Sequence, residues 1–157
     1  MKMKEIIRIA QKFIDNENLV HPFDSHLEYY LDPAPKDLGL YWYFDYLIRP
    51  KIDAPKRGKL DFGGASGFTV SKITHKVEMI AHGCYPDLEA GKKRFDEIEN
   101  LLRTSGNIWQ ELRKKTGLTA SQAMNLRRRI GALDLDVEKN RLLIIEEIME
   151  RIEGNNG

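Results

Sequence analysis

Cysteine is almost absent from this 157-residue chain, which contains only Cys84. One cysteine cannot form a disulfide within the chain, and alone it supplies too few ligands for a structural metal site. A run of about 18 apolar residues, which a membrane-spanning helix needs, is also missing. The first residues (MKMKEIIRIAQKF) are charged too often for the apolar core of a signal peptide. We therefore expect a cytoplasmic protein with no membrane contact.

An excess of charge of one sign is missing as well. The 25 lysines and arginines nearly balance the 24 aspartates and glutamates, which leaves a formal net charge of +1. This balance excludes attraction of the whole molecule to nucleic acid or to an anionic membrane, so only local patches can act electrostatically. The length suits one domain, or one domain with an appendage, and it is sufficient to bury a core without disulfides or metals.

The chain also lacks the signatures of common active sites. No serine stands in a Gly-x-Ser-x-Gly elbow. The glycine-rich segment 63–67 lacks the lysine and Ser/Thr of a phosphate-binding loop, and a strand rather than a helix is expected after it. His82 and Cys84 resemble half of a metal site whose second half is absent. We therefore expect a non-enzymatic protein with no cofactor and no metal.

Hydrophobic patterning predicts one helix followed by strands in the first part of the chain. Apolar residues at three- and four-residue steps predict an amphipathic helix over 3–15. A short strand is expected over 26–31, and the aromatic-rich segment 40–48 predicts a single central strand. Residues 50–65 are expected to form a connecting loop. Residues 67–81 predict a hairpin that turns near 74–75 without the usual glycine or asparagine.

The last part of the chain is predicted to be wholly helical. A helix is expected to begin near Pro86, and the best internal boundary lies at 104–107. The helices expected after it are 108–115, which ends at Gly117, 119–130, which begins with a Thr119 cap, and 136–153. The last of these has an expected apolar stripe of Leu142, Leu143, Ile145, Ile148, Met149 and Ile152.

These elements predict an α+β fold. We expect an N-terminal helix to pack on a small antiparallel sheet in a domain over 1–104, and we expect 105–157 to form a helical C-terminal extension.

A basic cluster in the helical part is the most informative charge pattern. Between 112 and 130 the chain has no acidic residue and six basic ones, Arg113, Lys114, Lys115, Arg127, Arg128 and Arg129. Two short helices joined by a glycine-containing turn are typical of a helix-turn-helix, whose second helix enters the major groove of DNA. The near-zero net charge and the short polar side chains of 119–125 weigh against that interpretation. An acidic protein partner would explain the same cluster equally well.

The order of motifs over residues 3–100 resembles the YrhB-like family, which is grouped with the immunity proteins of bacterial polymorphic toxin systems. The residues that carry the resemblance are Tyr41-Trp42-Tyr43-Phe44, Gly63-Gly64-Ala65, Phe68-Thr69-Val70-Ser71-Lys72, 77–80 and Tyr85-Pro86-Asp87-Leu88. The chain departs from the family in its hairpin, 73–76, and in a proline-rich insertion between strands. Separately, 109–124 is similar to the helical hairpin of the ribosomal stalk protein's C-terminal domain, from which we infer only a shared helical hairpin.

The family resemblance implies a binding protein that neutralises a cognate toxin by protein–protein contact. Such a protein needs a surface complementary to the toxin and no catalysis of its own. Asp53 and Asp61 would suit a basic toxin site, and the cluster Arg113, Lys114, Lys115, Arg127, Arg128 and Arg129 would suit an acidic one. A nucleic-acid-binding regulator that uses 108–130 and a chaperone-like stress protein stay open as alternatives, and a homodimer is compatible with each.

Overall fold

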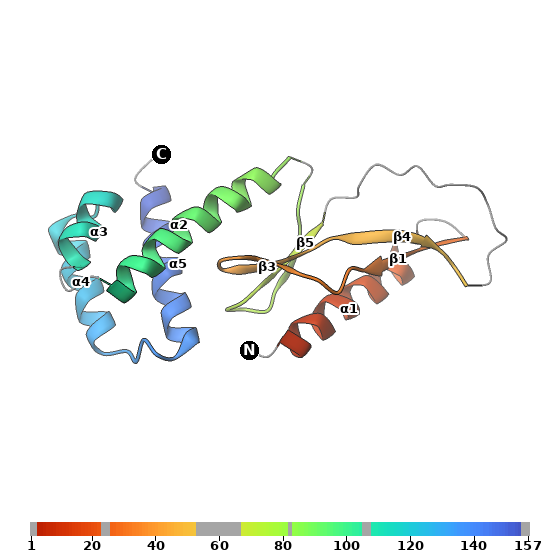
Figure 1. Ribbon diagram of the computed structural model, residues 1–157, viewed down its shortest axis with the longest axis horizontal. Coiled ribbons are helices and arrows are strands. Elements are labelled where there is room, and N and C mark those ends of the chain that lie inside the picture. The colour runs from red at the N-terminus through yellow and green to blue at the C-terminus, as the bar shows by residue number, and fades with distance from the viewer. Residues whose placement is uncertain (1–2, 23–25, 53–66, 82, 105–107, 155–157) are drawn as a thin grey trace. The chain divides into compact units, whose positions relative to one another are not determined.

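The computed structural model describes residues 3–22, 26–52, 67–81, 83–104 and 108–154. Contacts divide the chain into two compact units, Met1–Asp87 and Leu88–Gly157, which we call the α+β unit and the helical unit (Figure 1). The chain order is one helix, then strands, then helices. This order confirms the predicted α+β class.

The boundary between the units lies earlier than the sequence pattern places it, between residues 87 and 88 rather than near 104. The helix α2 (Tyr85–Thr104) therefore belongs almost entirely with the helices that follow it. Two ion pairs connect α2 to the last helix, Arg94 to Glu153 at 3.2 Å and Glu99 to Arg141 at 3.1 Å. Its buried side chains are Phe95, Ile98 and Leu101.

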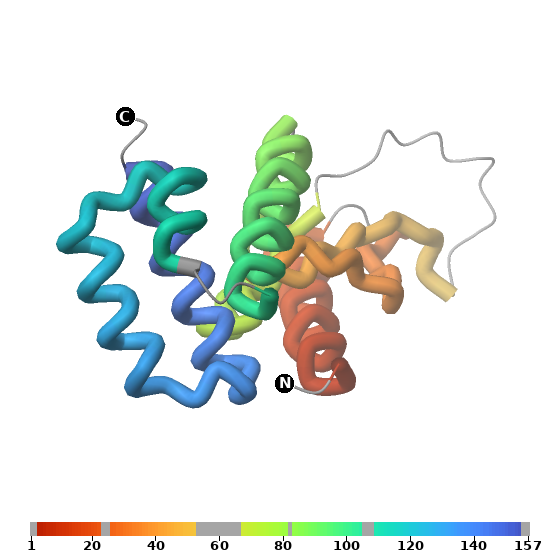
Figure 2. Tube along the Cα trace, turned by 60° about the vertical axis from the view of Figure 1, so that its left-hand side comes forward, coloured from red at the N-terminus to blue at the C-terminus, as the bar shows by residue number. Residues whose placement is uncertain are grey.

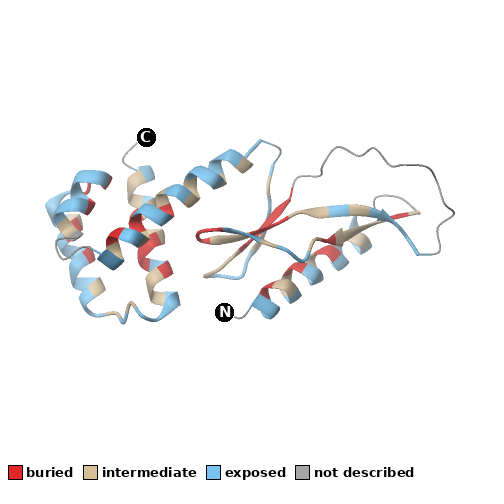
Figure 3. Cartoon of the chain, in the orientation of Figure 1, coloured by how far each residue is buried: buried red, intermediate tan, exposed pale blue. Residues whose placement is uncertain are grey.

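The α+β unit is built around α1 (Met3–Val20), which confirms and extends the predicted N-terminal helix. Its buried residues recur at four-residue steps, so that one face packs against the strands while the opposite face meets water (Figure 3). The core that results contains Ile6, Ala10, Ile14, Leu31, Phe44, Phe68 and Val70.

All strand pairs in the unit are antiparallel. A two-stranded sheet joins β1 (Leu27–Leu31) to β4 (Tyr46–Pro50). A four-stranded sheet has the order β2-β3-β5-β6 and consists of β2 (Lys36–Leu38), β3 (Tyr41–Phe44), β5 (Phe68–Ser71) and β6 (Val77–Met79). In its register Trp42 lies opposite Val70, and Phe44 opposite Phe68.

The prediction of one strand over 40–48 is wrong, because the chain leaves one sheet and joins the other at Asp45. The Asp45 carboxylate accepts a hydrogen bond from the Tyr43 hydroxyl at 2.8 Å, and the Asp45 carbonyl accepts one from the Asp32 amide at 3.3 Å. Aspartate is disfavoured within strands. These two bonds hold it at the crossing point, so β3 and β4 pair with different partners.

The predicted β5–β6 hairpin is confirmed, and the structure explains why it needs no glycine. His75 adopts the left-handed conformation with φ of 63°. The Ser71 hydroxyl accepts hydrogen bonds from the amides of Ile73 and Thr74, at 3.2 and 3.1 Å. A serine side chain therefore satisfies the loop amides that a tighter turn would pair through its backbone.

The helical unit consists of most of α2 together with α3 (Ile108–Thr116), α4 (Ala120–Gly131) and α5 (Glu138–Gly154). Figure 2 shows α4 and α5 running in opposite directions around their connecting loop. No described helix is both long and apolar enough to cross a membrane.

The buried face of α5 differs from the expected stripe at two neighbouring positions. Leu143 is 36% exposed, whereas Ile144 is fully buried. At about 100° per residue, Leu143 lies opposite the stripe of Leu142, Ile145 and Ile148. Including Leu143 in the stripe was therefore wrong.

Candidate functional site

The α3–α4 segment is a helix, a three-residue connection and a second helix, and local chemistry explains both helix ends. Gly117 ends α3 with φ of 67°, a conformation that glycine adopts without steric cost, and its amide donates to the Arg113 carbonyl at 3.1 Å. Thr119 caps α4 in a capping box. Its hydroxyl accepts from the Gln122 amide at 3.2 Å, and its own amide donates to the Gln122 side chain at 2.8 Å. The predicted stop at Gly117 and cap at Thr119 are confirmed.

Small and aliphatic side chains hold the two helices together. The buried residues of the segment are Leu112, Thr116, Leu118, Ala123 and Leu126. Thr116 satisfies its hydroxyl internally by donating to the Leu112 carbonyl. Because these five residues turn inward, most polar and basic side chains of both helices are left on the outside.

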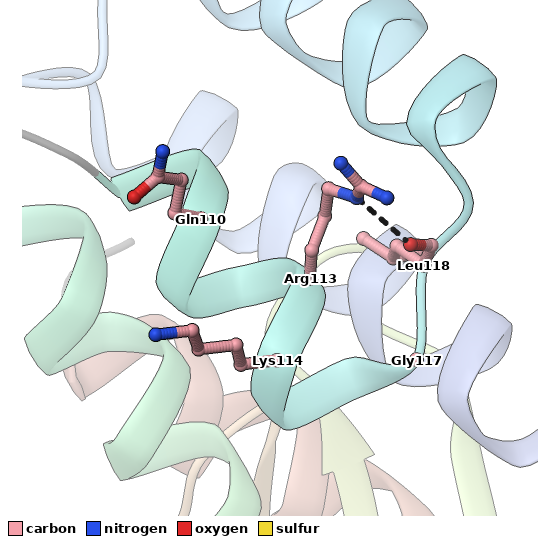
Figure 4. Close-up of a pocket in the computed structure, with 5 residues that line it drawn as sticks. All are labelled: Gln110, Arg113, Lys114, Gly117 and Leu118. Carbon is pink, nitrogen blue, oxygen red and sulfur yellow. Dashed lines mark hydrogen bonds between the residues drawn. The ribbon is translucent and has the colours of Figure 1, made fainter.

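Two adjoining depressions hollow this outer surface. One, of about 320 Å³, is lined by Gln110, Arg113, Lys114, Gly117 and Leu118 (Figure 4). The other, of about 280 Å³, is lined by Trp109, Gln110, Arg113, Ala120, Ala123, Met124 and Arg127. Both are lined by Arg113, so the structure brings basic residues 14 positions apart in the sequence to one hollowed surface.

The six predicted basic residues occupy different environments. Arg113 donates from Nε to the Leu118 carbonyl at 3.4 Å, while Lys114 extends away from Leu118 (Figure 4). Arg127 lines the second depression. Lys115 and Arg128 are exposed and line neither depression.

Arg129 does not belong to the surface that the sequence pattern assigned to it. Its guanidinium is paired with Glu147 of α5, whose carboxylate also binds Arg151 at 2.8 Å. The two residues are far apart in the sequence, so the charge pattern alone could not show this pairing. We therefore define the basic face as Arg113, Lys114, Lys115, Arg127 and Arg128.

The arginines of the basic face differ in their pairing from the other arginines of the helical unit. All four arginines of α2 and α5, Arg94, Arg103, Arg141 and Arg151, have a carboxylate partner. Within the described part of the chain, no residue of the basic face has a carboxylate within 4.0 Å. Its positive charge is therefore not neutralised internally, although the chain as a whole is nearly neutral.

Two apolar residues of this surface were missed by the sequence analysis. Trp109 lines the second depression, and Met124 beside it is 65% exposed. The available signal was the spacing of Ala120, Met124 and Arg127 along one side of α4. That spacing became informative only after Ala123 and Leu126 were known to face inward.

The predicted acidic candidates, Asp53 and Asp61, lie outside the described residues. His82 does too, and Cys84 is exposed. Among the residues that the structure describes, no group of three or more His, Cys, Asp or Glu side chains could hold a metal ion.

A second polar cluster lies in the α+β unit, around Tyr43. Burial, followed by its hydrogen bond to Asp45, raises the pKa of Tyr43 to about 12. Its ring contacts Tyr85 edge-on at 4.9 Å, and the Lys36 ammonium lies 5.1 Å from the Tyr85 ring. A hydroxyl with this pKa keeps its proton at neutral pH. The ring contact between Tyr43 and Tyr85 therefore holds the first turn of α2 to the sheet, and the Tyr43 hydroxyl stays protonated.

The chain matches no protein-family model, no curated protein and no solved structure. The description of the molecule therefore rests on its own fold and surface. An α+β unit is followed by a helical unit, and the helices α3 and α4 of that unit carry basic side chains that no described carboxylate neutralises.

Replacing Thr119 with alanine should destabilise the helical unit by about 1 kcal/mol, because the cap supplies a hydroxyl acceptor at the start of α4. Urea denaturation can be followed by Trp109 fluorescence in a Trp42→Phe background, since the chain has two tryptophans and Trp109 lies in α3. Thr104→Ala is the matched control. It removes an exposed hydroxyl that donates to the Asn100 carbonyl at the end of α2, and it should change stability by less than about 0.5 kcal/mol. Equal effects of the two substitutions would contradict the capping role.

Proposed function

We propose that the chain is a DNA-binding protein that binds duplex DNA through the α3–turn–α4 segment. The observation that supports this most strongly is the basic face, whose five cations have no described carboxylate partner. Cations that are not neutralised within a protein attract phosphates, and phosphate contacts supply most of the affinity of non-specific DNA binding.

The dimensions and order of the segment also suit DNA. A three-residue connection joins the helices, as in helix-turn-helix proteins, where the second helix enters the major groove. At 12 residues, α4 is about 18 Å long, and the major groove admits a single helix. Lys114 and Arg127 line the two adjoining depressions, where both would be available to phosphates beside the groove.

The test is a charge reversal at the two positions that line the depressions and form no described hydrogen bond. Lys114→Glu combined with Arg127→Glu should weaken binding to a mixed-sequence duplex of 20 base pairs by at least about tenfold at 50 mM salt. A plot of the logarithm of the affinity against the logarithm of the salt concentration should have a slope that is shallower by about 1.8, because each lost phosphate contact removes about 0.9 from the slope. Fluorescence anisotropy over a salt series measures both quantities.

The matched control reverses two exposed lysines of the same unit, Lys93→Glu with Lys139→Glu, and so produces the same change in net charge. We expect this control to bind nearly as tightly as the unmodified protein. Equal losses of duplex affinity in both variants, or no duplex binding at low salt, would contradict the proposal. Retention of poly-glutamate in the absence of duplex binding would instead favour an acidic protein partner.

We propose toxin neutralisation as a second function, carried by the α+β unit. It is supported by the resemblance to immunity proteins, whose motif residues form neighbouring paired strands, with Trp42 opposite Val70 and Phe44 opposite Phe68. The strand motifs of the resemblance therefore belong to one sheet, while 85–88 begin α2 and 63–65 lie outside the described residues.

The toxin hypothesis has a direct test in co-expression. The full chain, produced with a toxin domain encoded immediately upstream of its gene, should restore growth and elute with that domain as one complex in size-exclusion chromatography. The Lys114→Glu/Arg127→Glu variant should protect equally well if the α+β unit carries this function. Growth arrest without a complex would refute it.

A further inference from the structure

We infer that α4 recognises DNA sequence through one face formed by Ser121, Met124, Asn125 and Arg128, which we call the reading face. This inference rests on the proposed DNA binding and adds a preference for particular base pairs. All four side chains are exposed. They differ chemically from the proposed phosphate contacts Lys114 and Arg127, since they add a hydroxyl, a thioether and an amide to the guanidinium of Arg128.

The position of the reading face follows from helical geometry. At about 100° per residue, its four residues fall within an arc of about 100°. The inward-facing residues Ala123 and Leu126, with the half-buried Ile130, lie on the opposite side of the helix. The reading face is therefore directed away from the rest of the helical unit, as a helix must be oriented to meet base edges.

The two sides of the reading face are occupied differently. On one side Arg127 lines the depression between α4 and α3, and Met124 at the edge of the reading face lines it too. On the other side Arg129 is held by Glu147 of α5. The buried residues Ala123 and Leu126 set the rotation of α4 in the unit, which leaves Arg128 as the arginine at the centre of the exposed side.

The side chains of the reading face match base-edge chemistry in the major groove. An asparagine amide pairs with adenine through two hydrogen bonds, and an arginine pairs with guanine in the same way. Apolar side chains such as Met124 contact the thymine methyl group. Within the described part of the chain, the side chains of Asn125 and Arg128 form no hydrogen bond or ion pair, so binding a base would not break an internal contact. The expected target is a duplex site that contains an A·T pair next to a G·C pair.

Selection of sites from a random duplex library tests this inference. The unmodified protein should enrich one short sequence, and bind it about tenfold or more tightly than mixed-sequence duplex. Asn125→Ala should reduce that preference by about tenfold at the adenine position, while the affinity for mixed-sequence duplex changes less than twofold. Asn100→Ala, at an exposed position of α2, is the matched control and should preserve the enriched sequence.

The outcomes separate the inference from the function on which it rests. Salt-sensitive duplex binding with no enriched sequence would overturn the reading face and leave the proposed DNA binding intact. An enriched sequence that Asn125→Ala does not change would overturn the role of that residue. Absence of any duplex binding would overturn both.

Discussion

Phe68→Ala should lower the free energy of unfolding of the α+β unit by about 4 kcal/mol. The side chain is fully buried, and its ring stacks on Phe44 with centroids 5.4 Å apart and an angle of 11° between planes. It also contacts Phe13 of α1 at 4.7 Å. Removing the ring therefore loses its burial and leaves a cavity where the helix meets the sheet.

The two tryptophans allow this loss to be assigned to one unit. In a Trp109→Phe background, Trp42 packs against the same core and reports unfolding of the α+β unit alone. Urea denaturation of this background with and without Phe68→Ala gives the difference. Met79→Ala is the matched control, because Met79 lies opposite Phe68 in the register but is 49% exposed. A loss below about 1 kcal/mol for Phe68→Ala would contradict the structure of this core.

Gly67→Ala should destabilise the same unit by about 3 kcal/mol, because no space exists for a methyl group there. A Cβ atom at Gly67 would overlap both the Phe44 carbonyl oxygen and the Tyr43 hydroxyl. A backbone shift that relieves the clash would strain the hydrogen bond that the Gly67 carbonyl accepts from the Ile80 amide at 3.0 Å. The substitution would therefore disturb the pairing on both sides of β5 and the hydrogen bond from Tyr43 to Asp45.

The matched control for this substitution is Gly91→Ala in α2. Its Cβ would meet only the Met149 Cε atom, at 4.0 Å, and alanine favours a helix interior. The control should stabilise the helical unit by about 0.5–1 kcal/mol. Both variants can be measured by urea denaturation with the single-tryptophan backgrounds. If Gly67→Ala left the free energy of unfolding unchanged, the close approach of β3 to Gly67 would be absent.

Features that depend on neighbours in the sequence were predictable. The capping box of Thr119 and Gln122, the stop at Gly117 and the amphipathic face of α1 each involve residues no more than four positions apart. Helix periodicity and caps depend on such short separations, so the amino-acid order contains the information for them.

The strand prediction failed where two sheets compete for one segment. Residues 40–48 look like a single strand because their aromatic side chains suit either sheet. The partners that decide between the sheets, β5 for β3 and β1 for β4, lie elsewhere in the chain. The boundary near residue 104 differs from the observed one for a similar reason, since α2 packs with α5 across more than forty residues of sequence.

The candidate site also combines features that the amino-acid order predicted with features that only the tertiary structure decided. The amino-acid order was sufficient to identify the cluster of cations, the helix–turn–helix order and both helix ends, because each is a local pattern. Only the tertiary structure removed Arg129 from the cluster, by pairing it with Glu147, and added Trp109 and Met124 to the surface. The physical reason is that a charge is neutralised by the carboxylate nearest in space, and a helix face is exposed only where no other element covers it. Separation along the chain determines neither which carboxylate is nearest nor which element covers a helix face.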